Sequence, residues 1–546
     1  MILFLYFILS MLLTSSLTYS TSTKKKPLTV AESSHFTATS RYVEVIEFIR
    51  ELQRQSSQIR VETFCQSIEG RDVPLLILGQ PVPSSPQELR NDKRGVIYIQ
   101  ANIHAGEVEG KEASLMLARD ILLNEKLPFL DKLVILIAPI LNADGNEKIS
   151  PENRPRQAGP EKGVGVRHNG QNLDLNRDSM KLESPELQGL VRNVLMRWDP
   201  LLLVDCHTTN GVYHEEPVTY SWPLNSNGDT SIIEYMRESM LPSISTRLKD
   251  KYNTLSIPYG IFMDVNNPEK GWRTFAPQPR FVTNYTGLRN RLAILDENYA
   301  YADYKTRVFG CYHFLLSILD YCHAHKDDIA ALVVAADRKT IQRGLHPSEK
   351  DAFAVEFEMK PLKKPVTVHG WEMKVFPREG RWPRVEKTDV KRVFTLSYYA
   401  DFISKRTVKF PYAYLLPDPI PEINEKLLQH GIMLERLTQA VALEVESFRI
   451  KEIKGADRLY QGHRLNAVKG DYAVEQKNFP EGTVFIGTAQ PLGTLAACLL
   501  EPESDDGLLV WNFFDRYLVT QWRGAPRTYP VYKLLKPVNI PKEMRR

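Results

Sequence analysis

The chain has 546 residues, which is too long for one ordinary domain and leaves room for about three. Hydrophobic residues make up 43% and charged residues 25%, a balance that is typical of globular proteins and excludes a largely disordered chain. The formal net charge of +4 is small for this length, so the composition gives no sign of nucleic-acid binding. The five cysteines are scattered and odd in number, which argues against a disulfide framework.

The N-terminus begins with an apolar stretch, residues 2–13, that is too short to span a membrane as a mature helix. Its length is typical of the hydrophobic region of a signal peptide. No basic residue precedes the stretch, and the lysines at 24–26 follow it closely, a pattern that opposes export. On balance we predict a signal peptide over residues 1–20, a secreted or periplasmic protein, and no stable membrane span after processing.

Strand and helix patterns alternate through the first 325 residues. Apolar runs rich in Val, Ile and Leu predict buried strands at 75–78, 96–99, 133–137, 201–207 and 291–297. Apolar residues at helical spacing predict helices at 43–52, from the turn after the second strand to about 124, at 187–195 and at 305–324. This alternation predicts an α/β fold, a mixed, largely parallel β-sheet with helices on both faces.

The pattern changes in the last third of the chain. Residues 327–343 read as a connecting helix; beyond them we predict strands at 366–375, 392–399 and 484–487 and helices at 427–437 and 492–500. The expected domains are therefore a signal peptide at 1–20, a first domain at 35–325, a connecting helix and linker at 326–360, and an accessory α+β domain at 361–546.

Polar residues follow the predicted strands where they end. His104 and Glu107 follow the second strand, His207 ends the fourth, and Asp296 and Glu297 end the fifth. The carboxyl ends of parallel strands meet at one edge of a sheet, where α/β proteins bind their ligands. An imidazole and a carboxylate three residues apart can supply two of the three protein ligands of a catalytic zinc. Taken singly, His207 is better explained as a hydrogen-bonded structural histidine, and each acid as a helix cap or a salt-bridge partner.

The His-x-x-Glu spacing alone is weak evidence, because it recurs at residues 346–349 and 369–372. Only the first pair follows an apolar strand and precedes a helix. A long loop rich in Gly and Pro, at about 150–166, leads to a polar stretch at 167–178 that carries two arginines. The simplest interpretation of that stretch is a solvated loop with surface salt bridges.

Together these motifs resemble the zinc carboxypeptidase family of metallopeptidases, over about residues 41–325. The resemblance rests on motifs in the family's order: His104-Ala105-Gly106-Glu107, His207 after an apolar strand, Arg167-x-Asn169 followed by Asp174-Leu175-Asn176-Arg177, and Glu297 after a late strand. It implies one zinc ion held by His104, Glu107 and His207. The layout is similar to large bacterial members of the family that carry a C-terminal extension.

The resemblance also implies catalytic roles. Glu297 takes the proton of a zinc-activated water and passes it to the leaving amine. Arg167 stabilises the oxyanion of the tetrahedral intermediate. Asn176 and Arg177 hold the terminal carboxylate of the substrate, for which a guanidinium is well shaped. The implied substrate is a peptide with a free C-terminal carboxylate.

Asp174 is implied to hydrogen-bond a ligand histidine, His104, and so to fix its tautomer. Some alternatives stay open. Asp296 is a rival to Glu297, and Arg154 and Arg156 in the long loop are rival anion binders.

Two parts of the family's substrate site have no secure counterpart in the sequence. Tyr285 is a candidate for the substrate-capping tyrosine, with structural packing as its alternative role. The pocket that sets side-chain preference should lie within residues 258–290.

The sequence therefore predicts a zinc-dependent metallocarboxypeptidase. One alternative is a zinc amidase that acts on cell-wall peptides or N-acyl amino acids, since both substrates carry a free carboxylate near the scissile bond. Another is a binding protein with a degenerate enzyme domain, which should lack a ligand or the base; none is missing here. The accessory domain is expected to form one wall of the active-site cleft.

Overall fold

The computed structural model describes residues 26–124, 127–209, 212–378, 383–417, 420–518 and 527–544. The signal peptide predicted at residues 1–20 lies outside these ranges. Among the described helices, none combines the length and the apolar character that crossing a membrane requires.

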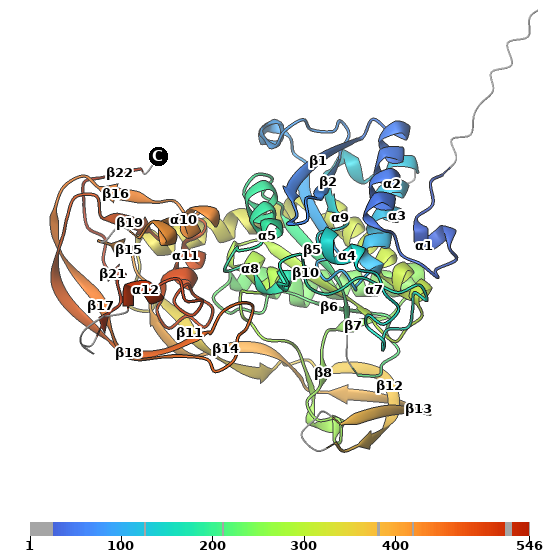
Figure 1. The fold of residues 1–546 in the computed structure, drawn as a ribbon. Coiled ribbons are helices and arrows are strands. Elements are labelled where there is room, and N and C mark those ends of the chain that lie inside the picture. The colour runs from blue at the N-terminus through green and yellow to red at the C-terminus, as the bar shows by residue number, and fades with distance from the viewer. Residues whose placement is uncertain are drawn as a thin grey trace, which may run out of the picture.

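An eight-stranded mixed sheet forms the core of the first part of the chain (Figure 1). Its strands are β1 (Ile59–Gln66), β2 (Asp72–Leu78), β3 (Gly95–Ala101), β4 (Leu133–Ala138), β5 (Leu202–Thr209), β6 (Val218–Ser221), β7 (Ser256–Pro258) and β10 (Leu292–Tyr299). They lie in the order β1-β2-β4-β3-β5-β10-β6-β7. The central strands β4, β3, β5 and β10 run parallel, while β1 and β2 pair antiparallel with their neighbours. Strand β6 pairs antiparallel with β10 and parallel with β7.

The central strands are buried at every position of β3, β4 and β5, which explains their nearly continuous Val, Ile and Leu. The helices of this part are α1 (Val30–Ser33), α2 (Tyr42–Gln55), α3 (Glu109–Leu123), α4 (Ala143–Glu147), α5 (Pro185–Gly189), the π-helical η4 (Leu190–Leu195), α6 (Thr230–Tyr235), α7 (Leu241–Tyr252) and α8 (Val282–Leu288). The predicted strands all overlap observed ones, and the predicted α/β fold class is confirmed.

A single long helix, α9 (Tyr304–Leu345), leads from the first part of the chain into the C-terminal part. We predicted two helices, at 305–324 and 327–343. The structure joins them, and only His325 departs from helical backbone angles. No proline or glycine separates the two segments, so nothing in the sequence ends the helix there.

The C-terminal part is built mainly of antiparallel strands. They are β11 (Ala352–Pro361), β12 (Val366–Phe376), β13 (Arg384–Leu396), β14 (Tyr398–Lys409), β15 (Ala413–Leu416), β16 (Glu435–Leu437), β17 (Val441–Gly455), β18 (Asn466–Phe479), β19 (Val484–Gly487), β20 (Arg527–Thr528), β21 (Tyr532–Leu534) and β22 (Lys542–Met544). Its helices are α10 (Pro421–Gln429), α11 (Gly493–Leu500) and α12 (Asp515–Leu518). One sheet has the order β18-β17-β21-β15-β19-β16-β22, and β12 and β13 form a separate hairpin.

The helix predicted at 427–437 is wrong over most of its length. α10 ends at Gln429, and Gly431 then takes a φ of 86°, a left-handed conformation that stops the helix. Residues 435–437 form β16 instead. The apolar residues here are buried in clusters built from distant segments of the chain, and local periodicity does not reveal that tertiary packing.

The two parts of the chain share a sheet. β8 (Ile261–Phe262) and β9 (Trp272–Arg273) come from the first part, and β9 pairs in parallel with β14 of the C-terminal part. The loop that follows β5 also pairs with the β12–β13 hairpin, through the bridge between His214 and Gly370. The C-terminal part is thus hydrogen-bonded to loops at the carboxyl edge of the main sheet.

Candidate active site

Three strands bring the predicted polar residues to one edge of the main sheet. In the register of β5 and β10, Glu297 lies directly opposite His207. His104 and Glu107 lie in the turn after β3, the strand on the other side of β5. Gly106 is required in that turn, because a Cβ there would lie 2.6 Å from the Arg154 side chain and 2.8 Å from the oxygen of Gly165.

His104, Glu107 and His207 form a compact, buried cluster of metal-ligating groups. The Nδ1 atoms of His104 and His207 are 3.2 Å apart. One Glu107 oxygen lies 3.1 Å from His104 Nδ1, and the other lies 2.8 Å from His207 Nδ1. Ligand atoms at about 2.0–2.1 Å on a tetrahedral zinc ion lie on the order of 3.3 Å apart, so this cluster fits such an ion.

The outer nitrogens of both rings face carboxylates. His104 Nε2 lies 2.9 Å from an Asp174 oxygen, and His207 Nε2 lies 2.8 Å from Asp205. These partners orient both imidazoles with Nδ1 toward the centre of the cluster, the arrangement typical of histidine metal ligands. Burial opposes charge on His207, but Asp205 and Glu107 raise the pKa of His207 well above its usual value. Burial alone would raise the pKa of Asp174, yet His104 and Arg167 hold it below its usual range.

The predicted anion binders separate into two groups. Arg154 donates from Nη2 to Glu107 at 2.7 Å and so belongs to the ligand cluster. Arg156 contacts Tyr301 outside it. Arg167 donates from Nε to Asp174 at 2.8 Å, and its Nη1 lies 3.6 Å from Glu107.

Asn176 and Arg177 lie beside a cavity of about 210 Å³. The cavity is lined by Glu107, Arg167, Asn176, Arg177, Thr208, Thr209, Tyr259, Phe275, Phe281, Thr283, Leu295 and Glu297. Asn176 Oδ1 accepts a hydrogen bond from the amide of Val282 at 2.9 Å, and the Arg177 guanidinium lies 4.4 Å from the centre of the Phe281 ring. Most of the predicted site residues therefore surround one small cavity next to the histidine cluster.

Glu297 and Asp296 point to opposite faces of the sheet, as adjacent strand residues must. Glu297 lines the cavity, whereas Asp296 accepts a hydrogen bond from Cys311 Sγ at 3.1 Å, on the side of α9. Burial and the nearby Glu107 raise the pKa of Glu297 to about 8, against the opposing effects of His207 and Arg167. Cys206 lies with Asp296 and Cys311 in the core, as expected for a small buried residue.

Two tyrosines, Tyr285 and Tyr259, do not have the positions that the sequence led us to expect. Tyr285 is 1% exposed, and its hydroxyl lies 2.8 Å from His430 Nδ1 of the C-terminal part, so it packs structurally and does not reach the cavity. Tyr259 lines the cavity instead, and the sequence analysis missed it. It falls within the range 258–290 that we expected to hold the pocket, but no local motif distinguishes it from neighbouring aromatic residues.

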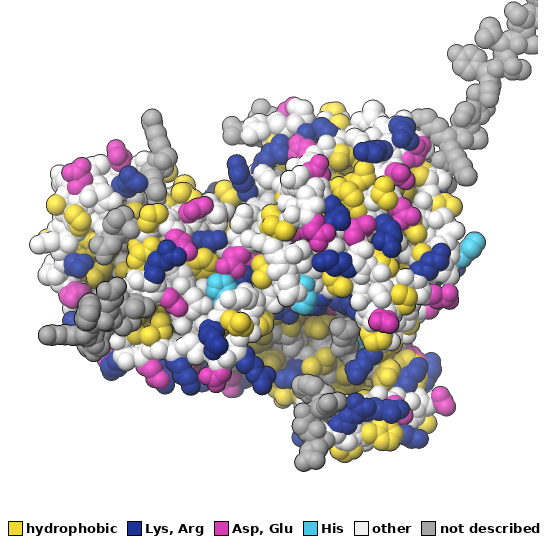
Figure 2. All heavy atoms as spheres, in the orientation of Figure 1, with side chains coloured by type: hydrophobic (Ala, Val, Ile, Leu, Met, Phe, Trp, Pro, Cys, Tyr) yellow, Lys and Arg dark blue, Asp and Glu magenta, His cyan; other side chains and the backbone are white. Residues whose placement is uncertain are grey.

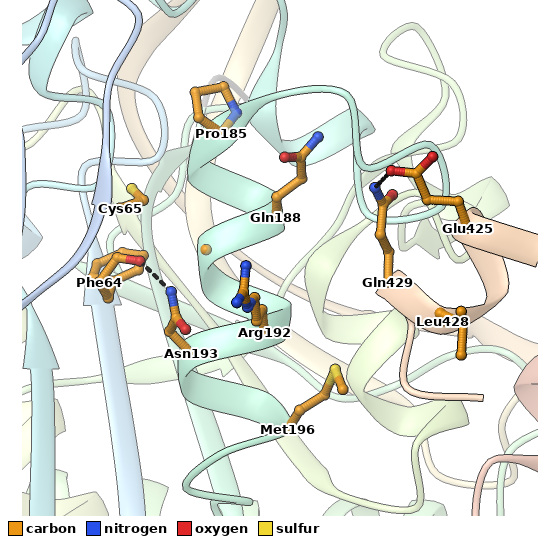
Figure 3. Close-up of a pocket in the computed structure, with 11 residues that line it drawn as sticks. Phe64, Cys65, Pro185, Gln188, Arg192, Asn193, Met196, Glu425, Leu428 and Gln429 are labelled. Carbon is orange, nitrogen blue, oxygen red and sulfur yellow. Dashed lines mark hydrogen bonds between the residues drawn. The ribbon is translucent and has the colours of Figure 1, made fainter. Parts of the chain in front are cut away.

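The surface is also hollowed at two places. In Figure 2 the surface is hollowed between the body of the first part and the lobe formed by the β12–β13 hairpin. A groove of about 470 Å³ lies between η4 and α10, where Arg192 and Met196 face Leu428 and Gln429 (Figure 3). None of the predicted site residues lines this groove, and its lining offers no nucleophile paired with a base.

Known proteins with similar sequences are carboxypeptidases by name. The family model described as "Zinc carboxypeptidase" matches residues 45–189. The chain is 23% identical to "Carboxypeptidase 2" of Trichophyton rubrum over 501 residues, covering 86% of this chain and 84% of that protein. It is 22% identical to the protein of the same name from Trichophyton tonsurans over 483 residues, covering 84% and 81%.

Two solved structures with some similarity are named as carboxypeptidases. A metallo-carboxypeptidase from Pseudomonas aeruginosa, in complex with (2-guanidinoethylmercapto)succinic acid, is 17% identical with a TM-score of 0.39, covering 53% of this chain and 69% of that one. Carboxypeptidase A from Helicoverpa armigera is 14% identical with a TM-score of 0.40, covering 55% and 75%.

Proposed function

We propose that this chain, whose residues 45–189 match the zinc carboxypeptidase family model, removes single residues from the C-terminus of peptides, with one zinc ion held by His104, Glu107 and His207. One observation carries this proposal. The Nδ1 atoms of two buried histidines lie 3.2 Å apart, and each lies within 3.1 Å of one oxygen of the buried Glu107, beside a cavity lined by Arg177 and Glu297.

The chemistry follows from the position of each side chain. A zinc ion at this cluster supplies a Lewis acid that activates water and polarises the scissile carbonyl. Glu297, which lines the cavity together with Glu107 and Arg167, takes a proton from the attacking water and delivers it to the leaving amine. Arg167, held between Asp174 and Glu107, offers its remaining N–H groups to the developing oxyanion.

The cavity orients the substrate. Asn176 and Arg177 bind the terminal carboxylate at one wall, which places the scissile bond toward Glu107 and Glu297. The remaining lining residues are uncharged: Thr208, Thr209, Tyr259, Phe275, Phe281, Thr283 and Leu295. An aromatic or aliphatic C-terminal side chain fits this wall, whereas a charged one would lose its hydration without gaining a partner.

A mixed peptide library tests the proposal. Half of the peptides carry free C-termini and half are amidated, and loss of terminal residues is read by mass spectrometry with and without a chelator. We expect chelator-sensitive loss of single apolar residues from the free peptides only. The double variant His104→Ala/Glu107→Gln should be inactive, while the exposed pair with the same spacing provides a matched control, His346→Ala/Glu349→Gln, that should keep full activity.

Two outcomes contradict the proposal. Cleavage of amidated peptides would show that the terminal carboxylate is not recognised. Zinc binding without cleavage of any library member, together with hydrolysis of cell-wall peptides or N-acyl amino acids, would favour the amidase alternative.

A further inference from the structure

The tip of the β17–β18 hairpin, residues 456–465, reaches the active site from the C-terminal part of the chain. Gln461 at this tip accepts a hydrogen bond on Oε1 from the main-chain N–H of Asp174 at 2.7 Å. The two residues are 287 positions apart in the sequence. Gln461 is half-buried, whereas residues 456–459 and Gly462 are exposed.

The tip is a tight two-residue turn. The main chains of Tyr460 and His463 exchange two hydrogen bonds, of 2.7 and 3.0 Å, around Gln461 and Gly462. Both central residues have positive φ, 51° and 81°, and turns of this kind favour Asn-Gly or Gly-Gly at these positions. Glutamine is a poor choice for such a backbone, so local turn formation does not explain it.

Two anchors hold the tip against the first part of the chain. His463 Nε2 lies 2.9 Å from Glu183, and His463 Nδ1 lies 3.2 Å from Asn512. The ring of Tyr460 lies 5.3 Å from the Arg280 guanidinium, next to the cavity residue Phe281. The position of Gln461 is therefore set by neighbours on both sides.

Asp174 is the residue through which this contact acts. Its carboxylate lies 2.9 Å from His104 Nε2, and it accepts hydrogen bonds from Arg167 Nε at 2.8 Å and from the amide of Asn176 at 3.0 Å. A shift of the Asp174 main chain would thus move a metal-ligand imidazole, the oxyanion arginine and the carboxylate-binding segment together.

We propose that Gln461 is a positioning residue of the active site, which fixes the main chain of Asp174 and thereby the His104 ring and the Asn176-Arg177 pair. The inference rests on the function proposed above for these residues. It gives the C-terminal part a role in positioning the catalytic groups, although all the residues that line the cavity belong to the first part.

Three substitutions of Gln461 distinguish the effect of losing the hydrogen bond to Asp174 from the effect of disturbing the hairpin turn. Asn suits a positive φ better than Gln but is one methylene shorter, so Gln461→Asn should keep the turn and lose the hydrogen bond to Asp174. Gln461→Met keeps the length without a strong acceptor, and Gln461→Glu keeps the acceptor oxygen. The neighbouring side chain of Leu459 is 67% exposed, so Leu459→Ala is the matched control.

The readouts are the zinc dissociation constant, by competition with a chromogenic chelator, and kcat and KM on a peptide with a free C-terminus. We expect Gln461→Asn and Gln461→Met to weaken zinc binding and raise KM by about three- to tenfold each, less than the 10–100-fold typical of a direct partner of a ligand. Gln461→Glu and Leu459→Ala should stay within about twofold of the wild type. Thermal unfolding confirms that each variant is folded.

The proposal is overturned if Gln461→Asn retains both the zinc dissociation constant and KM of the wild type. It is also overturned if Gln461→Glu and Leu459→Ala lose as much as the other variants, because the tip would then act only as structure. Zinc binding decides the role of Gln461 even if no peptide is cleaved, so failure of the proposed activity is distinguishable from failure of this inference.

Discussion

Asp296 and Glu297 are adjacent carboxyls at the end of one strand, and the pleat of β10 assigns them to different environments. Glu297 faces the cavity with Arg167 and Glu107, while Asp296 faces Cys311 on α9. Burial raises the pKa of Asp296 to about 7 and that of Glu297 to about 8. The two pKa values are therefore similar. Only the orientation of the side chains makes Glu297 the candidate base and Asp296 a core residue.

Glu297→Gln tests this assignment. Because the amide cannot take a proton from water, we expect kcat to fall by about 10²–10⁴-fold, while zinc content and KM stay near those of the wild type. Asp296→Asn is the control, since an amide resembles the protonated carboxyl, and it should leave kcat nearly unchanged. Steady-state kinetics and metal analysis of both variants provide the check, and an active Glu297→Gln enzyme would remove Glu297 from the mechanism.

At the scale of elements, α5 carries a buried carboxyl in its first turn. The helix begins after Ser184, whose hydroxyl accepts a hydrogen bond from the amide N–H of Leu187 at 3.2 Å. Glu186 is fully buried, and its only side-chain partner among the described residues is Asn169, at 3.1 Å. Burial raises the pKa of Glu186 to about 7, and the nearby Asp144 adds to the effect.

This carboxyl should make stability fall as pH rises. The folded state binds the proton more tightly than the unfolded state, so the contribution of Glu186 is fully present below pH 4.5 and is lost as the pH rises through 7. Between pH 5 and pH 8 the free energy of unfolding should fall by about 2 kcal/mol, because a pKa difference of one corresponds to about 1.4 kcal/mol. Denaturant unfolding of the wild type and Glu186→Gln across this range measures it. A difference between the two proteins that does not change with pH would contradict the prediction.

On the scale of the whole molecule, the C-terminal part is hydrogen-bonded to the segment that follows Asn176 and Arg177. His430 Nε2 lies 3.2 Å from the oxygen of Met180, and Lys426 donates to the oxygen of Leu182 at 3.0 Å. Arg280 forms a further link, since its main-chain N–H and its guanidinium both bind Asp506. The segment proposed to bind substrate thus depends on residues far away in the chain.

Acid should weaken the contact that His430 makes with the oxygen of Met180. Burial, with the nearby Arg289, lowers the pKa of His430 to about 3, so its contribution to stability is present above pH 6.5 and is lost as the pH falls toward 3. At pH 5 the loss is about 2 kcal/mol. Unfolding of the wild type and His430→Gln at pH 7.5 and pH 5 measures it through the difference between the two proteins. Tyr285, Lys426 and Arg289 face the same histidine and are unchanged in this comparison. A wild type that loses no more stability than the variant on acidification would contradict the prediction.

Local sequence was enough to predict the central sheet and the residues of the proposed chemistry. Continuous Val, Ile and Leu mark β3, β4 and β5 because these strands are buried on both faces. His104, Glu107 and the polar stretch from Arg167 to Arg177 are short motifs whose spacing reflects one turn or one loop. Such patterns are readable because the interactions behind them are local.

Other features were decided only by tertiary structure, because they depend on contacts between distant parts of the chain. Tyr259 enters the cavity while Tyr285 packs against His430, yet nothing local distinguishes the two tyrosines. Arg154 joins Glu107 across 47 positions, and Gln461 joins Asp174 across 287. The residue types and their order specify the candidate catalytic groups, whereas packing between distant parts of the chain decides which side chains support them.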